Sequence, residues 1–276
     1  MLLLAHAAFP GHIAVATVNH GLRPEAADEA GFVARLCGDL GLEHVTLAPD
    51  QPITGNIQSA ARVARYALLE QAADQARCDV IATAHHKDDQ LETLLMRLAR
   101  GSGLDGLAGV RATNGRVIRP VLGFAKAELE QICADAGVEP VRDPSNDDDD
   151  FDRVAMRQFL AERRHPFDAT RAARSASALA ETGEALDWVL DRLSDERIVM
   201  KGDSVVVDPS NLPRELQRRL LLAALHKIAP QIAPRGDAID RLLGDLHAGK
   251  TAMIGDILCK GTEGWRFSPA PPRRSV

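Results

Sequence analysis

The sequence predicts an α/β protein with a parallel sheet, followed by a second, mainly helical domain. Three observations support this. Short β-branched apolar runs alternate with amphipathic stretches in the first part of the chain. Polar clusters follow two of these runs, and from about Phe159 the composition becomes rich in Ala, Glu and Arg at helical spacing. We therefore expect residues 1–160 to form the α/β domain and residues 161–276 the helical one.

The elements of the first domain follow from hydrophobic periodicity. Residues at helical spacing predict helices over residues 2–8, 24–40, 56–77, 88–100 and 126–136, and a Gly or Pro-Gly follows each of them except the helix at 56–77. Short apolar runs rich in β-branched residues predict extended segments over 13–18, 45–47, 79–84 and 117–121, and the runs at 13–18 and 79–84 are typical of buried parallel strands. Ligands of such sheets bind beyond the carboxyl ends of the strands.

The second domain has the same kind of signals in a different order. Helical spacing predicts helices over 168–198, 213–228 and 234–247. Strand-like runs lie at 205–207, 252–258 and 264–267. The tail from Pro269 to Val276 is rich in Pro and Arg, and we expect it to be disordered.

The bulk composition excludes several classes of protein. The chain has 276 residues and a formal net charge of -6, which argues against coating nucleic acid through overall charge. Aromatic content of 4% argues against a stacking surface for single strands. The four cysteines are scattered without a Cys-x-x-Cys pair, as expected of a reduced cytoplasmic protein. No apolar run approaches the ~18 residues of a membrane span, and the start lacks the basic region of a signal peptide.

The densest candidate site is the run AHHKDDQLET from Ala84 to Thr93, at a strand-to-helix turn. On a helix, Asp89 and Glu92 share a face, as do Asp88 and Glu92. Paired carboxylates suit an ammonium ligand or a Mg²⁺ ion. Capping of the helix start is the alternative, but it explains one Asp and leaves the two histidines and Glu92 unexplained. Zinc is disfavoured, because adjacent histidines point apart and no i, i+4 His pair exists.

Three further segments remain open between function and ordinary structure. The glycines from Gly101 to Gly106 allow close approach to a ligand, but Gly after a helix is usually a C-cap. Arg62 and Arg65 lie on one helical turn and suit phosphates or a solvated face equally. The acidic run at 147–150 reads as solvated. A basic stripe that follows is either an RNA contact or a surface helix; it comprises Arg153, Arg157, Arg163, Arg164, Arg171 and Arg174.

Four segments together resemble the lysidine synthetase family of N-type ATP pyrophosphatases, in the PP-loop superfamily. They are VNHGLRPEA from Val18, GNIQSAARVARY from Gly55, AHHKDDQLETLLMRLARGSGLDGLAG from Ala84, and IRPVLGFAKAEL with DPSNDDDDFDRVAMR after Ile118. The similarity covers about residues 1–160. It implies a PP-loop catalytic domain with the sheet of the adenine-nucleotide alpha-hydrolases.

The resemblance also implies a two-step reaction. ATP, with Mg²⁺, adenylates the C2 carbonyl oxygen of the wobble cytidine of an isoleucine tRNA, and the ε-amine of free L-lysine then attacks C2 and displaces AMP. The product, lysidine, pairs with A and allows AUA decoding. Adenylation makes the oxygen a leaving group, and the amine must be held close and neutral. A cytoplasmic enzyme without membrane contact is expected, and a homodimer is left open.

The resemblance assigns residues to this reaction by motif position. On the catalytic side, His85, Asp89 and Glu92 would hold lysine and the reacting nucleotide, and Arg62 would face the phosphates or the activated base. The residues expected on the ATP side are Asn19, His20, Gly21, Gly101 and Gly103. The residues expected to contact substrate or tRNA are Asp88, Arg65, Arg100, Asn146, Arg153 and Arg157. Two positions depart from the family pattern: Val154 replaces an Asn, and Gln58 stands where Glu is frequent.

The family opens with a strand and an S-G-G-x-D-S phosphate loop, whereas this sequence starts within the helix that follows. Backbone N–H groups of such a loop grip pyrophosphate. We therefore expect the native start to lie upstream, and ATP binding to be poor without it. Two alternatives stay open: a tRNA thiolation enzyme, disfavoured by the unpaired cysteines, and a non-catalytic tRNA-binding module.

Overall fold

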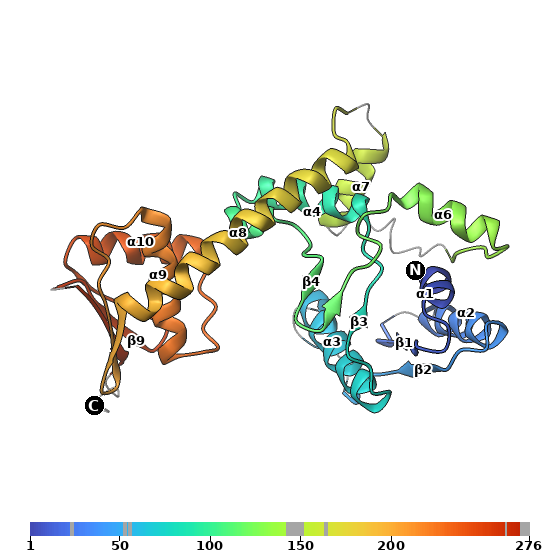
Figure 1. Cartoon of the computed structure of the whole chain (residues 1–276), viewed down its shortest axis with the longest axis horizontal. Helices are drawn as coiled ribbons and strands as arrows, with labels where there is room; N and C mark the ends of the chain where they lie inside the picture. The colour runs from blue at the N-terminus through green and yellow to red at the C-terminus, as the bar shows by residue number, and fades with distance from the viewer. Residues whose placement is uncertain are drawn as a thin grey trace. The chain divides into compact units, whose positions relative to one another are not determined.

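The computed structural model describes residues 1–22, 25–51, 54, 57–141, 152–162, 165–262 and 264–270. The chain forms two compact units, Met1–Ala180 and Glu181–Val276 (Figure 1). The division falls within the long helix α8 (Ala169–Arg197). Residue 160, where the composition changes, lies within α7 (Asp152–Glu162). Asn146 and the tail after residue 270 are outside the described residues.

The first unit contains helices and short strands in alternation, as predicted. Its helices are α1 (Leu2–Ala8), α2 (Glu25–Asp39), α3 (Ile57–Gln75), α4 (Lys87–Ala99), α5 (Leu104–Leu107), α6 (Lys126–Asp135) and α7, followed by the first part of α8. Its strands are β1 (Val15–Val18), β2 (His44–Leu47), β3 (Ile81–Ala82), β4 (Thr113–Asn114) and β5 (Val117–Ile118). The short elements α5 and β4 were not predicted, and β3 and β5 are shorter than the apolar runs that contain them.

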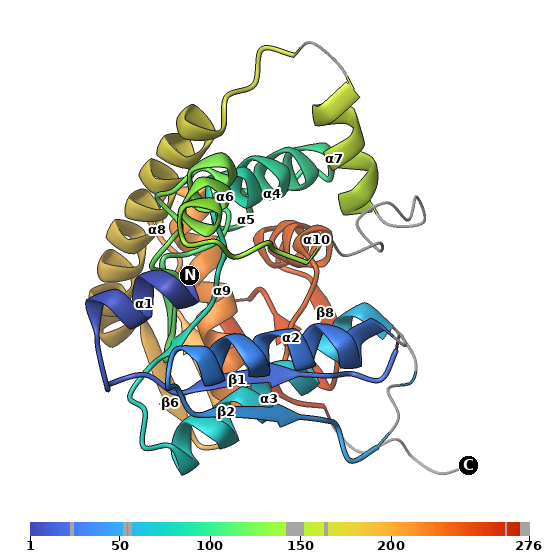
Figure 2. The same cartoon turned by 90° about the vertical axis from the view of Figure 1, so that its right-hand side faces the viewer.

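The predicted parallel pairing is confirmed in both small sheets of this unit. β1 pairs with β2 from Val15↔His44 to Val18↔Leu47, and helix α2 lies along the pair (Figure 2). The prediction that β1 is buried is wrong: all four of its residues are only half-buried. Within the described residues β1 is hydrogen-bonded to β2 alone, so one side of the strand has no neighbouring strand to cover it.

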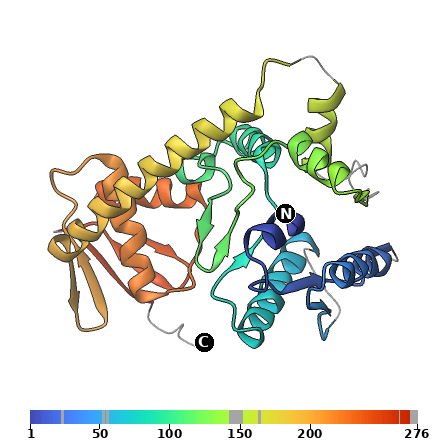
Figure 3. The same cartoon turned by 45° about the vertical axis from the view of Figure 1, so that its right-hand side comes forward.

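The second small sheet has the order β3-β5-β4, with β3 and β5 parallel (Figure 3). Ile81 and Val117 lie opposite each other in it and are buried with Ala73 of α3. Because the two strands are parallel, their carboxyl ends lie at one edge of the sheet. His85 follows β3 there, and Arg119 follows β5.

The second unit places helices α9 (Arg214–Ile228) and α10 (Gly236–His247) against a five-stranded antiparallel sheet. The strand order is β6-β7-β10-β9-β8. The strands are β6 (Ile198–Lys201), β7 (Ser204–Val207), β8 (Thr251–Ile254), β9 (Ile257–Lys260) and β10 (Trp265–Pro269). Alternate residues of β7, β9 and β10 are buried, as expected of a sheet covered on one face. Trp265 and Phe267 are fully buried in this core with the leucines of α9 and α10.

Two boundaries in the second unit differ from the prediction. The run at 252–258, predicted as one strand, is the hairpin of β8 and β9, because Gly255 adopts a left-handed φ of +53° and reverses the chain. The helix predicted to reach Ile198 ends at Arg197, and strand β6 begins immediately. No helix in the part of the chain that the structure describes is long and apolar enough to span a bilayer.

Candidate active site at the start of helix α4

The first turn of α4 is organised by its two aspartates, which have different partners. The backbone N–H of His86, the residue before the helix, donates to Asp89 Oδ2 at 2.9 Å. Asp88 Oδ2 instead accepts from the backbone N–H of Lys126, the first residue of α6, at 2.7 Å. Each carboxylate therefore satisfies a backbone donor at a helix start. Capping was predicted as the alternative to a ligand site, and both aspartates do it, in different helices.

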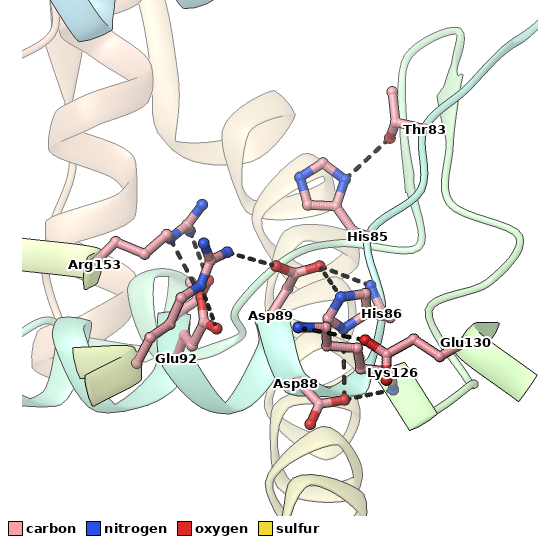
Figure 4. A network of polar contacts seen from close by, with 11 residues as sticks. Thr83, His85, His86, Asp88, Asp89, Glu92, Lys126, Glu130 and Arg153 are labelled. Carbon is pink, nitrogen blue, oxygen red and sulfur yellow. Dashed lines mark hydrogen bonds and ion pairs between the residues drawn. The ribbon is translucent and has the colours of Figure 1, made fainter. Parts of the chain in front are cut away.

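Asp89 and Glu92 are also buried, at 8% and 6% exposure, on the face of α4 that meets α7. Arg157 Nε donates to Glu92 Oε1 at 2.8 Å, and its NH2 lies 3.8 Å from Asp89 Oδ1. Arg153 Nε lies 3.7 Å from Glu92 Oε2 and its NH2 donates to Thr93 Oγ1 at 3.2 Å (Figure 4). The structure thus brings together four residues that the sequence singled out in two separate segments.

This pairing compensates the buried negative charge, because two carboxylates face two guanidinium groups. The first two arginines of the basic stripe, Arg153 and Arg157, lie on α7 and contact Glu92 of α4. One acceptor is left over: Glu92 Oε2 is buried and has no hydrogen-bond partner within the described residues. That oxygen is available to an amine or ammonium donor.

His85 lies beside this cluster, between β3 and α4. Its Nδ1 is 3.1 Å from Thr83 Oγ1 (Figure 4). Burial lowers the pKa of His85 below its ordinary 6.5, and the positive charges of Arg119, Arg62 and Arg153 lower it further, against an opposing effect of Asp89. His85 is therefore neutral near pH 7 and can accept a proton on one ring nitrogen.

The candidate ATP-side residues lie at the end of β1 and next to α3. Asn19 Oδ1 accepts the backbone N–H of Gly21 at 2.9 Å, which closes a small turn, and Gly21 has a φ of +65°. Arg65 Nε donates to His20 Nε2 at 3.3 Å, and burial followed by the charge of Arg65 lowers the pKa of His20. The turn after β1 is thereby linked to helix α3.

Arg62 is exposed one turn from Arg65, and its guanidinium lies 5.0 Å from the ring centre of Tyr66. Its charge reaches both His85 and Arg97, since it lowers the pKa of each. Among the predicted site residues, Arg62 thus belongs electrostatically with His85, Asp89 and the α7 arginines.

The glycine-rich segment after α4 ends the helix as the structural alternative predicted. Arg100 is the C-cap, and Gly101 follows with a φ of +68° and donates its N–H to the carbonyl of Leu98 at 3.0 Å. Gly103 precedes α5 as its N-cap. Among the described residues, no hydrogen bond joins either glycine to His85, Asp89 or Glu92.

Two residues that the sequence did not single out hold this segment in place. The Gln90 side-chain amide donates to the carbonyl of Val110 and accepts its N–H, each at 2.7 Å. Arg97 NH1 donates to the carbonyls of Gly106 and Gly109, at 2.5 and 3.1 Å. Gln90 and Arg97 are seven residues apart, two helical turns, and so share a face of α4. That spacing of polar residues was the available signal.

A third residue, Arg119, was also missed, although its position just after an apolar strand was visible in the sequence. It is 7% exposed, and its NH1 donates to the carbonyl of Arg111 at 2.6 Å. A charged residue in an otherwise apolar strand context is unusual enough to flag a site.

The paired carboxylates of α4 were also predicted to suit a Mg²⁺ ion. Within the described ranges, no group of three or more His, Cys, Asp or Glu side chains is arranged to hold a metal ion. Arg157 donates to Glu92 Oε1 and lies near Asp89 Oδ1, so these two oxygens are not open together to one metal ion, whereas Glu92 Oε2 has no hydrogen-bond partner among the described residues. Any Mg²⁺ used by this site would have to come with the phosphates of a nucleotide.

Comparison with known proteins gives consistent matches. A family model described as a PP-loop domain matches residues 1–164. The chain is 41% identical to the tRNA(Ile)-lysidine synthase of Zymomonas mobilis, over 100% of this chain and 86% of the relative. Identity and coverage are the same for the tRNA(Ile)-lysidine synthase of Novosphingobium aromaticivorans. The enzyme of that name from Ruegeria pomeroyi is 39% identical, over 90% of this chain and 62% of the relative.

The fold is also similar to that of solved structures. The U34-tRNA thiolase NcsA from Methanococcus maripaludis, solved with its 4Fe-4S cluster, superimposes with a TM-score of 0.52 and 20% identity, over 65% of this chain and 66% of that one. At this level of identity the likeness concerns the fold. The predicted PP-loop type of α/β fold is thereby confirmed.

Proposed function

Because the chain belongs to the PP-loop family and, within it, to the tRNA(Ile)-lysidine synthases, we propose that it joins free L-lysine to the wobble cytidine of an isoleucine tRNA, using ATP. In the first step ATP adenylates the C2 oxygen of the cytidine and pyrophosphate leaves. In the second step the lysine ε-amine bonds to C2, the C2–O bond breaks, and AMP leaves with the bonding electrons. The product is lysidine.

The observation that carries this proposal is the buried pair Asp89 and Glu92 beside a neutral His85. An alkylammonium ion needs negative partners in a partly dry site. Glu92 Oε2 is buried without a hydrogen-bond partner within the described residues, so it can accept a hydrogen bond from the amino group. Arg157 and Arg153 balance the charge of the pair when no ligand is bound.

His85 is our candidate for the group that accepts the proton released from the lysine nitrogen as its bond to C2 forms. The amine must be neutral to attack, and its ordinary pKa near 10 leaves it protonated at pH 7. In the tautomer with hydrogen on Nδ1, Thr83 Oγ1 accepts that hydrogen, and the Nε2 lone pair of His85 is free. Burial and the nearby arginines keep this imidazole neutral before the reaction.

We assign the nucleotide to the ends of the strands, where ligands of parallel sheets bind. The Asn19–Gly21 turn follows β1, and Arg62 of α3 supplies positive charge toward His85. Arg65, Arg100 and Asn146 remain candidates for tRNA contact, with Asn146 outside the described residues. Mg²⁺ enters this proposal as the counter-ion of the ATP phosphates, and the reaction takes place in the cytoplasm, where ATP, lysine and tRNA occur together.

The decisive test measures incorporation of labelled lysine into an isoleucine tRNA transcript, together with release of AMP and pyrophosphate. We expect one AMP per lysine incorporated and none without the tRNA. Asp89→Asn should abolish incorporation and leave tRNA binding within about twofold, because the substitution keeps the shape of the side chain and removes its charge. Failure of the chain, with or without an N-terminal extension, to incorporate lysine while it binds the tRNA would favour a non-catalytic tRNA-binding module.

A thiolation activity is the second candidate, favoured only by the likeness of fold. The four cysteines Cys37, Cys78, Cys133 and Cys259 come from four different segments, and Cys37 and Cys259 are buried. This arrangement offers no pair for persulfide transfer. Sulfur transfer from a labelled donor to the tRNA, retained when all four cysteines are changed to serine, would overturn this argument.

A further inference from the structure

The structure contains a buried arginine, Arg119, whose charge is not paired with a carboxylate in the part of the chain that the structure describes. Among the described residues only two arginines are buried, Arg119 at 7% and Arg219 at 6% exposure. Arg219 donates to Asp187 at 2.7 Å and to Glu215 at 3.0 Å, as a buried charge should. Arg119 has no carboxylate within ion-pair distance in the same described set, and its Nε is buried without a hydrogen-bond partner.

Burial of an unpaired charge is costly, because the lost hydration is not replaced. Among the described residues, the Arg119 side chain forms a hydrogen bond from NH1 to the carbonyl of Arg111 at 2.6 Å, which compensates only part of this loss. A structure that only needed to fill this volume would do better with an apolar side chain. An uncompensated buried charge is instead typical of a site that awaits a ligand of opposite sign.

The position of Arg119 agrees with this explanation. It follows β5, which is parallel to β3, so it lies at the same sheet edge as His85. The two residues interact, since the charge of Arg119 lowers the pKa of His85. The nearby carboxylates Asp89 and Glu92 face the arginines of α7, and their charge is used there.

The guanidinium is also held in a defined place. The backbone N–H of Arg119 donates to the carbonyl of Ala112 at 2.9 Å. The NH1 group of the Arg119 side chain donates to the carbonyl of Arg111, the residue before Ala112. Val110, next in the chain, is fixed to α4 by both atoms of the Gln90 amide. Gln90 therefore acts as a positioning residue for the loop that supports Arg119.

We propose that Arg119 binds an anionic oxygen group of a substrate in this site, either the α-carboxylate of the amino acid or a phosphate of the nucleotide. This rests on the proposed function and adds a residue to it. Carboxylate and phosphate share the geometry that a guanidinium recognises, two oxygens facing two N–H groups. Nε and the remaining terminal nitrogen of Arg119 supply such a pair.

The test compares Arg119→Met and Arg119→Lys with a matched control, Arg116→Met. Arg116 lies three residues earlier and has a carboxylate partner, Asp74 Oδ1 at 2.6 Å. Thermal unfolding of the full chain is measured alone and with lysine, ATP or pyrophosphate as probes. We expect Arg119→Met to unfold at the same or a higher temperature than the parent without a probe, and to lose at least half of the shift that the anionic probe gives. Arg116→Met should lower the unfolding temperature and keep the shift.

Kinetics then identify the anion. If Arg119 binds the α-carboxylate, the parent prefers lysine to cadaverine, which lacks that group, and Arg119→Met reduces this preference at least tenfold. If it binds a phosphate, the KM for ATP rises at least tenfold and the preference for lysine is unchanged. In either case Arg119→Lys should lose less than Arg119→Met, because lysine keeps the positive charge but lacks the paired N–H groups of the guanidinium.

Two results would overturn the proposal. One is a fall in the unfolding temperature of Arg119→Met with probe shifts and both KM values unchanged, which would make Arg119 structural. The other is a parent chain in which no anionic probe raises the unfolding temperature. Because the thermal measurement needs no turnover, a chain that binds anions through Arg119 and incorporates no lysine would contradict the proposed function and keep this assignment.

Discussion

Replacing Arg157 by Met tests whether the contact between α4 and α7 stabilises the first unit. Arg157 Nε donates to Glu92 Oε1 at 2.8 Å, and the Glu92 side chain is 7% exposed. The methionine keeps most of the volume of the aliphatic stem and removes the charge. Among the described residues, Glu92 then retains as its ion-pair partner the more distant Arg153, whose Nε lies 3.7 Å from Oε2.

The expected loss follows from the burial of the two partners. Breaking a fully buried ion pair costs about 3–5 kcal/mol, and one hydrogen bond to a charged group contributes about 1.5–3 kcal/mol. The Arg157 side chain is 35% exposed, so solvent screens part of the interaction. We therefore expect Arg157→Met to lower the free energy of unfolding by about 2 kcal/mol, at the lower end of these ranges.

The assay is urea unfolding at pH 7 for Arg157→Met, Glu92→Gln and the double variant. Because Arg157 also lies near Asp89, the double-mutant cycle is needed to isolate the pair, and we expect a coupling energy of about 1–2 kcal/mol. Arg153→Met is the matched control, since its guanidinium is farther from Glu92 and its side chain is 43% exposed. Additive effects in the cycle, with Arg157→Met no worse than Arg153→Met, would refute the reasoning.

Three further predictions rest on the structure: one concerns a substitution, one the labelling of cysteines and one the pH dependence of activity. Gly109→Ala should lower the free energy of unfolding by about 2–3 kcal/mol in urea, because the new Cβ would lie 2.3 Å from Gln90 Oε1 at a φ of +69°. Burial raises the pKa of the Cys259 thiol to about 12, so iodoacetamide at pH 8 should modify the half-buried Cys78 and leave Cys259 until the chain unfolds. The acidic limb of lysine incorporation against pH should have its midpoint below 6.5, because the folded pKa of His85 is lowered.

Each of these has a contrary outcome and a control. Gly115→Ala also has a positive φ, +57°, but its Cβ would meet open space, so it should cost only about 1 kcal/mol; equal losses at Gly109 and Gly115 would contradict the clash with Gln90. Equal labelling rates for the two cysteines would contradict the burial of Cys259. An acidic limb at or above pH 6.5 would contradict the neutral His85. Since the folded pKa is lower than the unfolded one, the stability contributed by neutral His85 is complete above pH 6.5 and is lost as the pH falls below it.

The sequence predicted the elements of the α/β unit because its strands and helices differ in local pattern. Ile81 and Val117 lie in short β-branched runs, and their parallel pairing follows from the helices between the strands. The break between Arg197 and Ile198 carried no such signal, since no Gly or Pro separates the helix from the strand. The pairing of Ile198 with Val207 decides that boundary, and it is a tertiary contact.

Prediction of the site was limited in the same way. The paired carboxylates were visible as Asp89 and Glu92 on one helical face, but their arginine partners lie about 65 residues further along the chain. The role of Asp88 depended on the backbone of Lys126, 38 residues away. The place of Arg119 after an apolar strand was visible, but its hydrogen-bond partners, the carbonyls of Arg111 and Ala112, are set by the fold. Residue types can be recognised locally, whereas their partners are set by the fold.

The hydrogen bond between Asp88 and the start of α6 has one more consequence. The backbone N–H of Lys87 donates to the carbonyl of Phe124 at 2.9 Å. Together with the bond from Lys126 to Asp88, this hydrogen bond holds the start of α4 against the start of α6. Each helix start carries a partial positive charge of roughly half a proton from its aligned peptide dipoles. The carboxylates of Asp89 and Asp88 lie at these two positive ends and offset them. Replacing either aspartate with Asn would leave one helix start without its negative partner, so the electrostatic potential at this end of α4 would become more favourable to anions.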